Sequence, residues 1–222
     1  MDQTNQIFFD AAASGDFAKV VASLQKGADV NVRNAEQRTA LMRSAKRGFD
    51  TIVRYLIDNS ADVNARDVNG KTALMGAAKK GYFDIAKMML ESGSEVDVQD
   101  AKGRNALMRA SFLGHEEVVE LLLKYNADVN QADEMGRTAL MEACLAFRVE
   151  VIKKLIVAGA KINAQDSNGC TSLMRASYSG YLELVTYLLE NGADKEIVDK
   201  EGNKAIHYVR EHNFTDLKPF LK

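Results

Sequence analysis

The side chains that most often carry out chemistry in enzymes form no recognisable catalytic pattern in this 222-residue chain. His115, His207 and His212 belong to no HExxH motif and to no Cys–His or Ser–His arrangement, and there is neither a GxGxxG nor a Walker loop. Cys144 and Cys170 lack the CxxC spacing of a zinc site or a disulfide framework. We therefore predict that the protein is not an enzyme and uses no metal, other cofactor or small-molecule substrate.

Two further patterns could suggest chemistry, and both are better explained by structure. Glu116 and Glu117 are adjacent carboxylates, but they stand where a helix is expected to begin, and acidic side chains favour the helix dipole there. Five methionines recur at a constant interval, at Met42, Met75, Met108, Met141 and Met174. Because methionine is a flexible apolar filler, this column predicts a core between stacked units rather than a metal or redox stripe.

The methionine spacing belongs to a repeat that runs through the chain. The stretch from Asp67 to Met75, DVNGKTALM, recurs at intervals of 33 residues as DAKGRNALM, DEMGRTALM and DSNGCTSLM. A period of this length predicts stacked structural repeats with atypical capping repeats at the ends. We predict a single domain, residues 1–222, divided into repeats at 1–33, 34–66, 67–99, 100–132, 133–165, 166–198 and 199–222.

Each repeat carries signals for two short helices. An Asp-x-x-Gly turn is followed by a helix N-cap residue such as Thr72 or Thr138, whose hydroxyl can accept a backbone N–H. Glycines such as Gly48 and Gly81 are expected to end the first helix in the left-handed conformation. The second helix carries an apolar stripe and leads into an extended ADVN segment.

This order of turn, helix, glycine, helix, glycine and ADVN within 33 residues resembles the ankyrin repeat, and the resemblance covers essentially the whole chain. It implies an all-α solenoid of helix-turn-helix units with projecting β-hairpin-like loops and a concave binding groove. The family's usual TPLH becomes TALM here, with alanine for proline and methionine for histidine, as at Ala73 and Met75. In this respect the chain resembles bacterial ankyrin proteins more than the family consensus.

In the ankyrin family, the loop tips and the exposed side of the first helix line the groove, which implies which residues bind a partner here. The basic ones lie mainly in residues 34–132 and are Arg38, Arg43, Lys46, Arg47, Lys71, Lys79, Lys80, Arg104 and Arg109. Further positions are Arg137 and Arg175, and the apolar or aromatic residues Phe112, Leu113, Met135, Leu145, Phe147 and Tyr178. Glu142 is expected on the same helix side. Enrichment in arginine, methionine and aromatic residues is typical of an interface core; for any single residue, a solvated surface position is the alternative.

Three positions depart from the repeat pattern. Phe147 stands where glycine ends the first helix elsewhere, so the loop either adopts another conformation or tolerates a strained left-handed residue. Its role is either partner binding or local packing. In the last repeat, Asn213 replaces the same glycine and is expected in the left-handed conformation, and Pro219 should shorten or distort the final helix unless it lies in the first turn.

The predicted partner is another protein with an acidic surface and an apolar centre, and the predicted role is inhibition of a partner enzyme. A scaffold or adaptor and a nucleic-acid binder using the basic groove are the alternatives, although a net charge of −2 argues against nucleic acid. The chain has no run of about 18 apolar residues that would span a membrane. It begins without a signal peptide, so we expect a cytoplasmic protein, or a periplasmic one if a leader precedes residue 1. Because capped solenoids are usually monomeric, we expect a monomer.

Overall fold

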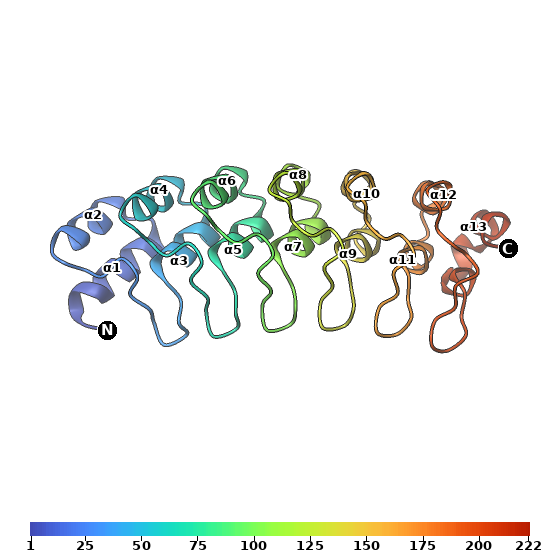
Figure 1. Ribbon diagram of the computed structural model, residues 1–222, viewed down its shortest axis with the longest axis horizontal. Helices are drawn as coiled ribbons and strands as arrows, with labels where there is room; N and C mark the ends of the chain where they lie inside the picture. Colours follow the sequence, from blue (N-terminus) through green and yellow to red (C-terminus); the bar gives the residue numbers. More distant parts are fainter. The chain divides into compact units, whose positions relative to one another are not determined.

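The computed structural model describes residues 1–222, which form short helices joined by turns and loops, with a single isolated β-bridge between Ala132 and Thr138. The chain divides into two compact units, Met1–Ala101 and Lys102–Lys222. We call them the N-terminal half and the C-terminal half. In each half, every repeat except the last one of the chain contributes a pair of helices followed by a long loop that points away from them (Figure 1). None of the helices has the length and apolar character needed to cross a membrane.

The N-terminal half contains three helix pairs, which are α1 (Gln3–Ser14) and α2 (Phe17–Gln25), α3 (Ala40–Arg47) and α4 (Asp50–Asp58), and α5 (Ala73–Lys80) and α6 (Phe83–Glu91). The first helices pack in the order α1, α3, α5, and the second helices in the order α2, α4, α6. Between them lies a core whose most completely buried large side chains are Phe8, Leu41, Ile52, Leu56, Leu74, Ile85 and Met89.

The C-terminal half also contains three helix pairs, which are α7 (Ala106–Leu113) and α8 (Glu116–Lys124), α9 (Ala139–Leu145) and α10 (Val149–Val157), and α11 (Ser172–Ser179) and α12 (Leu182–Glu190). The last repeat is formed by two 3-10 turns, η1 (Ala205–Tyr208) and η2 (Glu211–Asn213), and by α13 (Phe214–Leu221). Here the order of packing is α7, α9, α11 and η1. The core includes Leu107, Met108, Leu122, Leu140 and Met141.

The predicted helix signals are confirmed. The hydroxyl of Thr72 accepts the N–H of Met75 at 3.3 Å, and Thr138 caps its helix in the same way. Gly48 and Gly81 end their helices with φ of +82° and +74°, in the left-handed region that glycine enters without steric cost. The methionine column is buried in every repeat where it occurs, as expected for a core column.

The loops are held by their aspartates and by backbone contact with the neighbouring loop. Asp133 accepts the N–H groups of Met135 and Arg137, both at 2.9 Å, which closes the turn. The N–H of Glu134 reaches the carbonyl of Lys102 in the preceding loop. Gly103 makes this approach possible, because its φ is +71° and an added Cβ would lie 2.6 Å from the nitrogen of Glu134.

The last repeat differs from the sequence prediction. Asn213 has φ of −104°, so the expectation of a left-handed residue there is wrong. The reason is that η1 leads into extended backbone at Val209, and the chain needs no left-handed turn before α13. Pro219 lies inside α13, and the helix ends at Leu221.

Candidate functional site

One position of the first helix reads differently in the two halves of the chain. In the N-terminal half it is occupied by Lys46 and Lys79, and both are exposed. In the C-terminal half the equivalent residues are Phe112, Leu145 and Tyr178, of which Phe112 and Tyr178 are 38% and 46% exposed. Apart from the first and last repeats, where it holds Ala13 and Glu211, this position is therefore cationic in one half and apolar or aromatic in the other.

The predicted basic residues of the N-terminal half form one cluster, which we call the basic cluster. It consists of Arg38, Arg43, Lys46, Arg47, Lys71, Lys79 and Lys80. Lys46 is exposed as a whole residue, but partial removal of its amine from water lowers its pKa, and the positive charges of Arg38, Lys79, Arg43 and Lys80 lower it further. The structure thus brings Lys46 and these four residues within electrostatic reach of one another, and Arg47 and Lys71 are assigned to the cluster from their repeat positions.

Few carboxylates neutralise the basic cluster. Arg38 pairs with Asp67 at 3.4 Å and with Glu36. Arg43 lies over the ring of Phe9, with its guanidinium carbon 5.8 Å from the ring centroid. The remaining side chains for which the structure gives no ion pair are those of Lys46, Arg47, Lys71 and Lys80. A cluster of this kind attracts a negatively charged surface.

The predicted arginines of the C-terminal half are instead paired within the chain. Arg104 contacts Glu142 at 2.6 Å, and Arg137 contacts both Asp133 at 2.8 Å and Glu142 at 3.4 Å. Arg175 pairs with Asp166 at 2.5 Å. Most of their positive charge is therefore neutralised by ion pairs within the chain, and less of it is available to a partner.

Glu142 is the residue whose role the sequence missed. We expected it on the exposed helix side, but its side chain is only 3% exposed, because Arg104 and Arg137 cover it. Burial opposes ionisation of the nearby Asp133, yet the hydrogen bonds from Arg137 outweigh burial and lower the pKa of that carboxyl. The sequence did contain a signal for this role. Glu142 stands at the repeat position that is Arg109 in the preceding repeat and Arg175 in the following one, so an acid there is unusual.

The apolar residues of the C-terminal half are only partly gathered. Met135 at a loop tip is 48% exposed, whereas Leu113, Leu145 and Phe147 are half-buried. Phe147 takes the left-handed conformation, with φ of +64°, and its ring lies against Tyr181 of the next repeat. The strained loop thus has a packing partner, and a role for Phe147 in binding remains a prediction.

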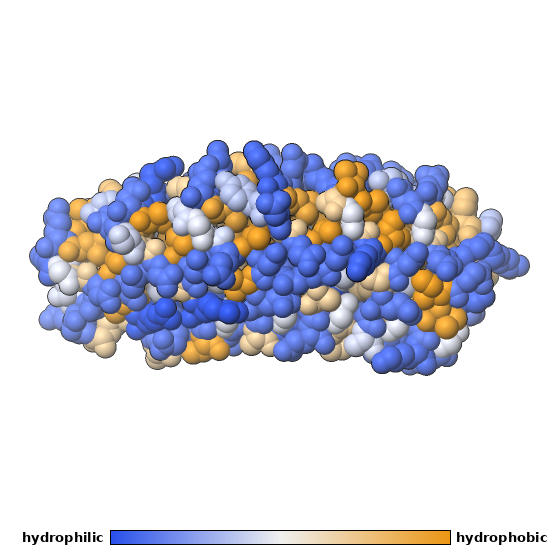
Figure 2. All heavy atoms as spheres, viewed as in Figure 1, coloured by the Kyte–Doolittle hydropathy of each residue, from blue (hydrophilic) through white to orange (hydrophobic).

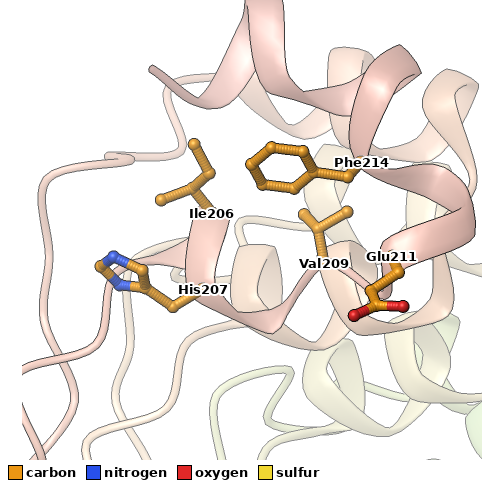
Figure 3. A pocket seen from close by; sticks show the side chains of 5 residues that line it. All are labelled: Ile206, His207, Val209, Glu211 and Phe214. Atoms are coloured by element: carbon orange, nitrogen blue, oxygen red, sulfur yellow. The ribbon is translucent and has the colours of Figure 1, made fainter.

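Two hollows lie in the C-terminal half. One, of about 240 Å³, is bounded by Leu145, Tyr178 and Tyr208. The other, of about 500 Å³, lies at the last repeat, where Ile206, Val209 and Phe214 face a common space (Figure 3). Hydrophobic atoms also gather over the last repeat in the space-filling view (Figure 2).

Comparisons with known proteins agree with this architecture. The family model described as ankyrin repeats (3 copies) matches residues 8–100, 92–166 and 140–221. The crystal structure of the human ASB11 ankyrin repeat domain is similar, with a TM-score of 0.85 and 25% sequence identity over 96% of each chain. No curated protein matches the chain.

Proposed function

This chain belongs to the ankyrin repeat family, a family of protein–protein interaction modules that are typically not enzymes, and we propose that its basic cluster binds an acidic segment of a partner protein. The observation that carries the proposal is the set of cations without an ion-pair partner, Lys46, Arg47, Lys71 and Lys80. A partner carboxylate can contact these cations without first displacing a carboxylate of the same chain, so the contact adds an attraction.

The C-terminal half supports an apolar contribution to the same partner. Phe112, Met135 and Tyr178 are exposed large side chains, and their residue types are those enriched in the centre of protein interfaces. The predicted partner surface is therefore acidic where it meets the basic cluster and apolar or aromatic where it meets these residues. The proposed role of Arg104, Arg109, Arg137 and Arg175 is to frame the apolar residues rather than to supply unpaired charge.

We propose inhibition of a partner enzyme as the biological role. A repeat module of this kind acts by occupying a surface of its partner, and occupation of a partner's functional surface inhibits it. A scaffold or adaptor would use the same contacts without changing the partner's activity, and this difference separates the two roles. Nucleic acid is the second candidate, favoured by the basic cluster alone, and it predicts affinity that falls steeply with salt.

A variant pair tests the proposal directly. Lys46→Glu with Lys79→Glu reverses two charges of the basic cluster, and Lys26→Glu with Lys87→Glu reverses two exposed lysines outside it. Each version of the chain is used in a pull-down from an extract of the source organism. The candidate partners are the proteins that bind the wild-type chain and the control pair but not the first pair. Each is then purified and its affinity measured by calorimetry.

We expect the first pair to weaken binding by about 100-fold or more, because placing like charges across an interface costs several kcal/mol. Equal affinity of both variant pairs would contradict the use of the basic cluster. If the partner is an enzyme, its activity with saturating wild-type chain decides between inhibitor and adaptor. A captured fraction that consists of nucleic acid would favour the second candidate.

A further inference from the structure

Gly76 lies in the interior of α5, although nothing within the chain requires a glycine there. Its backbone has ordinary helical geometry, and glycine is the least favourable residue after proline in a helix interior. An added Cβ would meet only Lys46 at close range, with its nearest atom at 3.5 Å, which is ordinary van der Waals contact. Because Gly76 is half-buried and has no side chain, it leaves an unfilled space beside Lys46. We call this space the Gly76 gap.

The equivalent position carries a long charged side chain in every other first helix from α3 to α11. These residues are Arg43, Arg109, Glu142 and Arg175. Glu142 shows how a carboxylate is held at this position. Its Oε2 lies 2.6 Å from Arg104 Nη2 of the preceding repeat, and its Oε1 lies 3.4 Å from Arg137 Nη1 of its own repeat. Two cations from consecutive repeats therefore hold this carboxylate.

The N-terminal half has the two cations of this arrangement but lacks the carboxylate. Arg38 and Lys71 stand two repeats before Arg104 and Arg137, just as Gly76 stands two repeats before Glu142. Both residues are therefore cationic at the positions that hold the carboxylate in the C-terminal half. The repeat geometry places them on either side of the Gly76 gap, one in the preceding repeat and one in the same repeat.

The cations around the Gly76 gap have donors to spare. Arg38 uses Nε for Asp67 and Nη1 for Glu36. Its Nη2, the atom that the equivalent arginine uses to hold a carboxylate, makes no ion pair. The amines of Lys46 and Lys71 make none either, and both lysines are exposed. Three donors at the gap are therefore available to an incoming acceptor.

The electrostatics of the gap favour a negative group. Partial removal of the Lys46 amine from water lowers its pKa, and the charges of Arg38 and Lys79 lower it further. A cation that entered the gap would add to this repulsion, whereas an anion would relieve it. An apolar group would cover the donors without offering them an acceptor. The group that the chain itself places at the equivalent position is the carboxylate of Glu142.

We propose that the Gly76 gap binds one aspartate or glutamate side chain of the partner, whose carboxylate takes the place that Glu142 fills in the C-terminal half. Its donors are Arg38 Nη2 and the amines of Lys46 and Lys71. This inference rests on the proposed function, because it gives the acidic segment of the partner one anchor residue and one anchor point. Hydrogen bonds between two charged groups are stronger than neutral ones, so this contact should contribute more to affinity than the rest of the basic cluster.

Lysine acetylation provides a readout that needs no partner. Acetic anhydride reacts with neutral amines, and a carboxylate bound to a lysine raises its pKa and slows the reaction. Lys46 and Lys71 report on the gap. Lys26 and Lys87 are exposed lysines outside the basic cluster and serve as internal controls. Peptide mass spectrometry of the full chain measures the four rates separately.

The probe is a hexaglutamate peptide with blocked termini, compared with blocked hexaglutamine and with inorganic phosphate at constant ionic strength. We expect hexaglutamate to slow acetylation of Lys46 and Lys71 at about tenfold lower concentration than it slows the control lysines, the factor for one hydrogen bond between charged groups. Hexaglutamine should protect none of them. Uniform protection of all four lysines, no protection by hexaglutamate, or protection by phosphate at lower concentration would overturn the proposal.

Two variants locate the effect in the gap. Gly76→Gln fills the space with a neutral side chain of the same length as glutamate and should raise the protecting concentration about tenfold. Gly76→Ala adds only a methyl group and should change it by less than about twofold. Both substitutions favour the helix, and circular dichroism checks that the variants remain folded. Equal protection in the two variants would mean that hexaglutamate binds the basic cluster without entering the gap, and would overturn the assignment.

The experiments keep the two proposals apart. Acetylation with hexaglutamate uses no partner, so it tests the gap alone. Partner capture with Lys46→Glu and Lys79→Glu tests the proposed function. A captured partner that loses affinity with this charge reversal but binds Gly76→Gln and Gly76→Ala equally would leave the proposed function standing and overturn the gap as its anchor point. Hexaglutamate protection without any captured partner would leave the gap standing and contradict the proposed function.

Discussion

Gly76 and Glu142 occupy the same repeat position, one in each half of the chain, and they have opposite effects on the surrounding charges. At Gly76 the helix α5 passes close to Lys46, with space for a Cβ 3.5 Å from the Cβ of that lysine, and offers no carboxylate. At Glu142 the carboxylate pairs with Arg104 and Arg137. The comparison shows that the side chain at this one repeat position decides whether nearby cations form ion pairs within the chain or remain available to a partner.

The two arrangements also differ in their contribution to folding. Like charges around Lys46 repel one another and disfavour its charged form. The buried pairs around Glu142 hold neighbouring repeats together, since Arg104 and Glu142 come from consecutive repeats. We therefore expect substitutions in the basic cluster to change binding, and substitutions around Glu142 to change stability.

The largest expected effect comes from Glu142→Ala. Removing this carboxylate takes one partner out of a buried ion-pair cluster, a change that costs about 3–5 kcal/mol, although Arg137 keeps its contact with Asp133 at 2.8 Å. Arg104 and Arg137 are 25% and 30% exposed, so we expect a loss of about 3 kcal/mol in the free energy of unfolding, measured with urea. Lys46→Ala in the N-terminal half should change it by less than about 0.5 kcal/mol. Equal losses in the two variants would remove the distinction between the halves.

The helix-ending position gives a second contrast. Gly48→Ala should destabilise the chain by about 1–2 kcal/mol, because the left-handed conformation disfavours a side chain. An added Cβ would also lie 2.9 Å from the ring of Tyr82. Phe147→Gly relieves the same strain but removes the ring contact with Tyr181, worth about 0.5–1.5 kcal/mol, so its net effect should be near zero. Thermal unfolding measures both variants; a clear gain in Phe147→Gly would mean that the ring contact contributes little to stability.

Gly76→Glu would give the N-terminal half the acid that the C-terminal half has. The residue has ordinary helical backbone and space for a Cβ, so the change should raise stability by about 1 kcal/mol through helix propensity. It should also lower the affinity for the acidic partner about tenfold, because the carboxylate of the new glutamate would compete with the partner for Lys46. Gly76→Ala is the control, with the stability gain and unchanged affinity. Equal affinities for the alanine and glutamate variants would show that the basic cluster does not contact the partner.

The smallest expected effect is the pH dependence of Lys46. Its pKa in the folded chain lies below the ordinary value of 10.5, so between the two values the unfolded chain binds the proton more often. The contribution of Lys46 to stability therefore rises as pH increases through this window. We expect less than about 0.5 kcal/mol, seen as the difference between wild type and Lys46→Met in urea unfolding at neutral and alkaline pH. An identical dependence of stability on pH in wild type and Lys46→Met would contradict the lowered pKa of Lys46.

Much of the fold is readable from local signals. Thr72 and Gly81 mark the two ends of α5, and each acts through atoms close in sequence, a hydroxyl on a backbone N–H and a backbone with positive φ. The methionine column was recognised as core because it recurs at the repeat period. The exposed lysines of the basic cluster follow from the same periodicity. The expectation of a left-handed Asn213 failed, since the first element of the last repeat is a 3-10 turn that leads into extended backbone at Val209.

The sequence by itself determined the repeat, its helices, its core column and the cationic series around Lys46, because each depends on residue type and spacing along one chain. Tertiary structure alone decided which charges remain available. Glu142 meets Arg104 across 38 residues, and Tyr208 meets Cys170 across the same separation, because stacking places each repeat against its neighbour. Whether a charged side chain finds its counterion depends on that three-dimensional neighbour, and a periodic pattern does not specify it.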